Sequence, residues 1–76
     1  MPYIKIKAYP KSEEIKNRVA ERVNQVFLEE WGCPPEAISL SFEEVAPENW
    51  QRTVQEPEIE SNADKMTILN GKKKYE

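Results

Sequence analysis

The sequence predicts a small α/β (α+β) fold built on a βαβ unit, in which one long crossover helix joins a parallel pair of strands. Two stretches, residues 3–9 and 37–45, alternate between apolar and polar side chains, as strands with one buried face do. Between these stretches, apolar residues recur at helical spacing. A helix that connects two strands of one sheet makes them parallel, with a right-handed crossover.

The boundaries of the first strand and the helix can be read from single residues. Pro10 ends the strand, and Ser12 can cap the helix, with Glu13 and Glu14 in its first turn. Gly32 ends the helix, and the two prolines that follow prevent a restart. The apolar positions of the helix form one stripe, which we expect to be core: Ile15, Val19, Ala20, Val23, Val26, Phe27 and Trp31.

The chain beyond residue 45 has a weaker pattern. Pro47 begins a predicted tight turn or short helical turn, which continues weakly to Pro57. Ser61 can cap one more short helix over residues 62–69, closed by Asn70 and Gly71. We expect this extended C-terminal segment to end in a frayed tail, residues 72–76.

A two-stranded sheet is not independently stable, which predicts self-association. The outer sheet face, with Lys5, Lys7, Ser39 and Ser41, is too polar for a hydrophobic interface. We therefore expect pairing at a strand edge and a homodimer with a four-stranded sheet; a hexamer is the alternative.

Length and composition restrict the classes of function. Seventy-six residues suffice for one domain, residues 1–76. One cysteine and no histidine exclude an intrachain disulfide and a zinc ligand set. A net charge of −3 argues against a nucleic-acid partner. The sequence has no apolar run typical of a signal peptide or membrane span, so we expect a cytoplasmic protein without a membrane partner.

The residue with the clearest chemical potential is Pro2, because removal of Met1 would expose a secondary amine at the start of the first strand. An α-amino group has a pKa of about 7.7 to 8.0, and nearby cations lower that value. Lys5, Lys7 and Lys11 supply a positive local field with no acid among the first eleven residues. A retained Met1 would instead make the Pro2 nitrogen an amide without basicity.

The first fifty or so residues resemble the 4-oxalocrotonate tautomerase family of the tautomerase superfamily. The resemblance rests on the opening Pro-Tyr-Ile-Lys-Ile-Lys from Pro2, the amphipathic helix after Ser12, the second strand, and the aromatic Trp50. The segment Pro-Glu-Asn-Trp-Gln and the chain length are similar to the dimeric, phenylpyruvate-type subgroup.

This resemblance implies a cofactor-free keto-enol isomerase acting on a small 2-oxo or 2-hydroxydienoic acid, with Pro2 as general base. The family's first substrate-binding arginine falls near Lys11, which keeps the charge but loses the bidentate grip on a carboxylate. The second arginine falls at Ser39, which puts a diacid substrate in doubt. Trp50 takes the place of an apolar wall, and Arg52 is a candidate for the missing cation.

Each assignment has a simpler alternative. Lys11 can be a solvated residue before a helix, and Trp50 can plug a thin core. Glu43 and Glu44 do not form a catalytic pair, because neighbours on a strand point to opposite faces. Two other functions stay open: a hydratase or dehalogenase acting on a small unsaturated acid, and a non-catalytic oligomeric interaction module.

Overall fold

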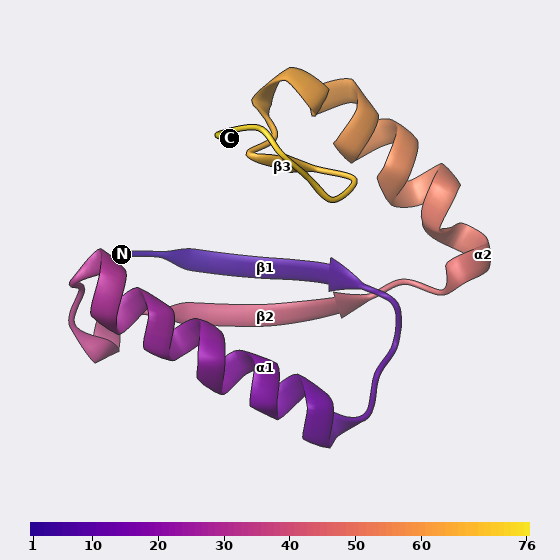
Figure 1. Ribbon diagram of the computed structural model, residues 1–76. Helices are drawn as coiled ribbons and strands as arrows, with labels where there is room; N and C mark the ends of the chain where they lie inside the picture. Colours follow the sequence, from indigo (N-terminus) through magenta and orange to yellow (C-terminus); the bar gives the residue numbers. More distant parts are fainter. The chain divides into compact units, whose positions relative to one another are not determined.

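The computed structural model describes residues 1–76, which form two compact units, residues 1–45 and residues 46–76. Figure 1 traces the chain through both units, which are described separately below. None of the helices is long and apolar enough to cross a membrane.

The first unit is the βαβ unit that the sequence predicts. It contains the strands β1 (Tyr3–Ala8) and β2 (Ser39–Glu44) and the helix α1 (Glu13–Val26). The two strands are parallel, with Tyr3 opposite Ser39 and Ala8 opposite Glu44. Helix α1 lies alongside the strand pair (Figure 1). The predicted fold class is thereby confirmed.

Both ends of the helix follow the predicted signals. The Ser12 side chain accepts a hydrogen bond from the Ile15 N–H at 3.3 Å, so Ser12 is the N-cap. After α1 the helix continues through a wider π turn, Phe27–Trp31. The helical segment ends at Gly32. Gly32 adopts a φ of 71°, a left-handed conformation that glycine takes without strain.

Trp31 corrects one expectation, because its side chain is 69% exposed rather than part of the core. Its ring contacts the Phe27 ring at a centroid distance of 5.4 Å. The apolar stripe assumes about 100° of rotation per residue. A π turn advances through a smaller angle, so Trp31 falls out of line with the preceding stripe.

Few hydrophobic side chains are fully covered by their own chain. Only Ala37 (8% exposed) and Val54 (5% exposed) count as buried. On α1, Ile15, Val19 and Val26 remain 39%, 39% and 54% exposed. The apolar stripe of this helix is therefore broader than the surface that one chain covers.

The second unit begins with a longer helical segment than the sequence indicates. Helix α2 (Pro47–Trp50) continues as a π-helical segment, Gln51–Ile59, and as 3₁₀ turns, Glu60–Lys65. Pro57 lies inside this segment and does not end it. Side chains one turn later bond the carbonyls near the proline: Ser61 donates to Pro57 O, and Asn62 donates to Glu58 O at 3.0 Å.

The helix predicted over residues 62–69 is confirmed only as far as Lys65, where the 3₁₀ turns end. Residues 66–69 are not helical, and Lys72–Lys73, within the expected frayed tail, form a strand. The chain instead forms a small antiparallel hairpin between β3 (Ile68–Leu69) and β4 (Lys72–Lys73). Asn70 and Gly71 connect the strands with φ values of 47° and 86°. Two consecutive residues with positive φ make a tight hairpin turn whose twist matches its strands, for which Asn-Gly is a favoured sequence.

Candidate active site

Pro2 lies at the beginning of β1, where its carbonyl oxygen accepts a hydrogen bond from the Ser39 N–H at 3.1 Å. This bond extends the parallel pairing by one step beyond the strand and fixes the start of the chain against β2. Pro2 is partly buried, whereas Met1 is 98% exposed. The structure therefore brings two of the predicted site residues, Pro2 and Ser39, together.

The lysines of β1 have an acidic partner that lies outside the first eleven residues. Glu43 on β2 approaches Lys5 Nζ at 2.9 Å and Lys7 Nζ at 4.0 Å. The hydrogen bond and charge of Lys5, with a smaller effect of Lys7, hold the pKa of Glu43 below its ordinary value. The positive field along β1 is therefore partly compensated. The parallel register, which places Glu43 opposite Lys7, is the signal that could have shown it.

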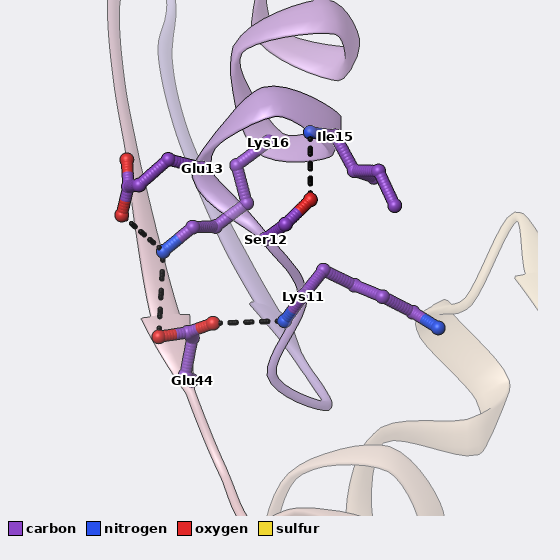
Figure 2. A network of polar contacts seen from close by, with 6 residues as sticks. All are labelled: Lys11, Ser12, Glu13, Ile15, Lys16 and Glu44. Carbon is purple, nitrogen blue, oxygen red and sulfur yellow. Dashed lines mark hydrogen bonds and ion pairs between the residues drawn. The ribbon is translucent and has the colours of Figure 1, made fainter.

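Lys11 lies beyond the opposite end of β1. The six residues of this strand separate Pro2 from Lys11 by about 20 Å at about 3.3 Å per residue. The Lys11 N–H donates to Glu44 Oε2 at 3.0 Å, and the Lys11 ammonium points away from that carboxylate (Figure 2). Pro2 and Lys11 of one chain therefore cannot both contact one small acid.

Glu44 also engages helix α1. Lys16 Nζ lies 3.4 Å from Glu44 Oε1 and 3.0 Å from Glu13 Oε1 (Figure 2). The bond from the Lys11 N–H is the main cause that lowers the pKa of Glu44, and the Glu13 contact is the main cause that raises the pKa of Lys16. As expected from strand geometry, Glu43 and Glu44 serve different neighbours and do not pair.

A cavity of about 140 Å³ lies at the Lys11 end of the first unit. Its apolar lining comes from both strands and from α1, and includes Ile6, Ile15, Val19 and Phe42. Two lysines and two glutamates also line it, through their apolar atoms: Lys11, Lys16, Glu43 and Glu44. Cavities of about this size can hold a benzene ring. The space therefore suits a small apolar or aromatic group.

Trp50 and Arg52 belong to the second unit. Trp50 is the last residue of α2 and is partly buried. The Arg52 guanidinium donates from Nη2 to Asn49 Oδ1 at 2.9 Å, so it bonds within its own helical segment. No three histidine, cysteine, aspartate or glutamate side chains come together in an arrangement that could hold a metal ion.

A parallel βαβ unit with a proline directly before its first strand resembles the small tautomerases, and comparisons with known proteins agree. The family model of tautomerase enzymes matches residues 2–58. Tautomerase PptA of Pectobacterium atrosepticum is 35% identical over 73 residues, 93% of this chain and 96% of that protein. Tautomerase PptA of Pectobacterium carotovorum is 32% identical with the same coverage.

A probable tautomerase of Xylella fastidiosa is 28% identical over 67 residues, 87% of this chain and 82% of that protein. The chain belongs to the tautomerase family, and it is an enzyme with tautomerase activity. The family resemblance read from the sequence is thereby confirmed. Neither the hydratase or dehalogenase function nor the non-catalytic module gains support from these relatives.

Proposed function

We propose that this tautomerase interconverts the enol and keto forms of a small 2-oxo or 2-hydroxydienoic acid, without a cofactor, with the Pro2 amine as general base. The observation that carries the proposal is the anchoring of Pro2 at the start of β1 by the Ser39 N–H. The family match also begins at residue 2. Removal of Met1 would create a secondary amine at a fixed position.

The reaction needs only one proton carrier. For the enol of phenylpyruvate, the free Pro2 amine accepts the enol hydroxyl proton, and the oxygen electron pair forms the C2=O double bond. The electron pair of the C2=C3 double bond then takes up the proton at C3, and the amine is neutral again. An amide nitrogen cannot perform the first step, so this mechanism requires the loss of Met1.

We further propose that the active site is shared between two copies of the chain. In a two-fold antiparallel pairing of two β1 edges, the start of one strand lies beside the end of the other. Pro2 of one copy then approaches Ala8, Lys11 and the cavity of the other copy. The exposed apolar positions on α1 support such a homodimer, because pairing at the sheet edge brings the two helices onto one face.

The charges favour a substrate with one carboxylate. We propose that Lys11, whose ammonium is turned away from Glu44, supplies one cation beside the cavity, whereas Ser39 stands beside Pro2 without a charge. The apolar lining favours an aromatic or short aliphatic group. Trp50 is assigned as an apolar wall that desolvates the amine, and Arg52 as a further cation for larger acids.

The test is the ketonisation of enol phenylpyruvate by three forms of the chain whose N-termini are verified by intact mass. The form that retains Met1 should lose about 10²–10⁴-fold in kcat/KM, the range that a general base contributes. Pro2→Ala keeps a primary amine after Met1 removal, so its activity should fall without vanishing. Equal activity of the processed and Met1-retaining forms would exclude Pro2 as the base.

The pH dependence adds an independent readout. In the processed enzyme, kcat/KM should rise with pH through the pKa of the amine, because only the neutral amine accepts a proton. Nitrogen NMR of labelled Pro2 should titrate at the same pH as this rise. A rise that does not follow the nitrogen signal would assign the base to another group.

The shared site can be tested by mixing two impaired chains. A Met1-retaining chain supplies Lys11, and a processed Lys11→Ala chain supplies Pro2, so a dimer of the two contains one intact site. An equimolar mixture should recover about a quarter of wild-type activity after subunit exchange. Sedimentation equilibrium at micromolar concentration should show a dimer. A monomer, or a mixture without recovery, would contradict the shared site. A hexamer would be compatible with the shared site but would contradict the predicted dimer.

A further inference from the structure

We propose that Glu44 is a positioning residue, which holds the backbone of Lys11 so that its ammonium faces the substrate carboxylate. This inference rests on the proposed role of Lys11 in substrate binding. Glu44 closes β2, and Lys11 lies 33 residues earlier in the loop between β1 and α1. The contact therefore joins the segment that bears the substrate-binding cation to the end of the neighbouring strand.

The two carboxylate oxygens of Glu44 have different partners. Oε2 accepts the hydrogen bond of the Lys11 N–H at 3.0 Å, whereas Oε1 faces Lys16 Nζ at 3.4 Å (Figure 2). Lys16 thus compensates the charge of the carboxylate. Because Glu44 binds Lys11 through the backbone and not through the ammonium, the charge of Lys11 remains available for another anion.

The backbone around Lys11 is held from both sides, which makes the single bond to Glu44 effective. Pro10 precedes Lys11 with a φ restricted by its ring. Ser12 follows as the N-cap, and its carbonyl accepts the Lys16 N–H at 3.0 Å. With these neighbours fixed, the bond from the Lys11 N–H fixes the peptide from which its side chain extends. The direction of the lysine stem then follows from ordinary rotamers.

The orientation of Lys11 matters because Lys11 lies next to the cavity. Lys11 and Glu44 both line it, at the ends of the two strands. A loop that moved would carry the ammonium away from the position proposed for the substrate carboxylate. Part of the binding free energy would then be offset by the entropy cost of ordering a long side chain. The contact from Lys11 also lowers the pKa of Glu44, so the carboxylate stays ionised and retains its strength as an acceptor at neutral pH.

The experiment compares three variants of the processed enzyme in the ketonisation of enol phenylpyruvate. Glu44→Ala removes the acceptor and should raise KM about fivefold with little change in kcat. Glu44→Gln keeps an acceptor oxygen and should restore KM to within about twofold of wild type. Glu13→Ala is the matched control, because it removes a carboxylate from the same Lys16 network but none from Lys11.

A double variant shows whether Glu44 acts through Lys11. Lys11→Ala should raise KM about tenfold, and adding Glu44→Ala should cause no further rise, because the positioned side chain is already absent. Urea unfolding of each variant identifies losses caused by global instability. Additive effects, or an equal rise of KM in Glu13→Ala, would overturn the positioning role.

The two proposals fail in different ways. If Lys11→Ala leaves KM unchanged, Lys11 does not bind the substrate, and both its role and the role of Glu44 are wrong. If Lys11→Ala raises KM while Glu44→Ala does not, the substrate role of Lys11 stands and only the positioning role is refuted. The Pro2 mechanism is measured separately by the Met1-retaining form.

Discussion

The contacts inside the first unit and those inside the second unit differ in how far apart their residues lie in the sequence. In the first unit, the pairing of β1 with β2, the ion pair of Glu43 with Lys5 and the bond from the Lys11 N–H to Glu44 connect residues more than thirty positions apart. In the second unit, the helical segment relies on side chains that bond carbonyls four residues earlier: Thr53 donates to Asn49 O at 2.7 Å, and Asn62 donates to Glu58 O at 3.0 Å.

This difference shows where a substitution can act at a distance. A change at Glu44 disturbs a loop far away in sequence, whereas a change at Thr53 disturbs one turn of helix. The residues proposed for proton transfer and carboxylate binding, Pro2 and Lys11, both lie in the unit with long-range contacts. We therefore expect substitutions in the first unit to change activity and substitutions in the second unit to change local structure. Trp50 is the exception, because it lies in the second unit and is proposed to act on the Pro2 amine.

Trp50→Ala gives the largest expected effect and tests this exception. If Trp50 desolvates the Pro2 amine, kcat for enol phenylpyruvate should fall about tenfold or more. Its partial burial predicts a loss of stability below the roughly 3–5 kcal/mol of a fully buried tryptophan. Thermal melts and turnover should be compared on the same sample. An early melt with normal turnover at a temperature where the variant is folded would show that Trp50 is a core plug.

Val54→Ala tests whether both units form one cooperative domain, residues 1–76. Val54 is 5% exposed, so its truncation should cost about 1–2 kcal/mol. The chain offers a reporter in each unit, since Trp31 lies in the first and Trp50 in the second. Single-tryptophan variants, Trp50→Phe and Trp31→Phe, should show the same urea midpoint. Destabilisation of the second unit alone would make the units independent domains.

Ser12→Ala should lower the stability by a smaller amount, because it weakens the start of helix α1 in the first unit. The substitution removes the acceptor of the Ile15 N–H and should cost about 1 kcal/mol. Ser12→Asn supplies an alternative cap and should restore most of this loss. Equal stability of the alanine variant and the wild type would show that the cap contributes nothing in this chain.

Acid titration should give the smallest effect. The folded-state pKa values of Glu43 and Glu44 are lowered from about 4.5, so their contributions are complete above that pH. Stability should decrease as the pH falls through the lowered values and the carboxylates become protonated. The urea midpoint of Glu44→Gln should depend less on pH than that of the wild type. An unchanged pH dependence would mean that the Glu44 contacts do not stabilise the fold in solution.

The sequence is sufficient to predict those elements in which apolar side chains recur with a regular period. The alternation of β1 and β2, the N-cap at Ser12 and the glycine end of the helix were all predictable. The π turn before Gly32 was not, because a change in winding leaves no periodic signal over five residues. The hairpin has a local signal, Asn70-Gly71, but the same two residues also predict a helix end, because both structures favour them.

The candidate site was less predictable than the fold. Position alone identifies Pro2, but the contact of Lys11 with Glu44 depends on the strand register and on the path of the loop. The same register places Glu43 beside Lys5 and Lys7, so a field inferred from the first eleven residues was incomplete. Contacts between distant residues require the pairing to be known before their charges can be summed.

The exposed apolar stripe of α1 also has a consequence for the rate of folding. With Ala37 and Val54 as its only buried hydrophobic residues, one chain alone gains little free energy from hydrophobic burial. If the final step joins two chains, refolding at high dilution becomes second order, and its half-time should double when the protein concentration is halved. Newly made chains would then mature fastest where several are synthesised close together.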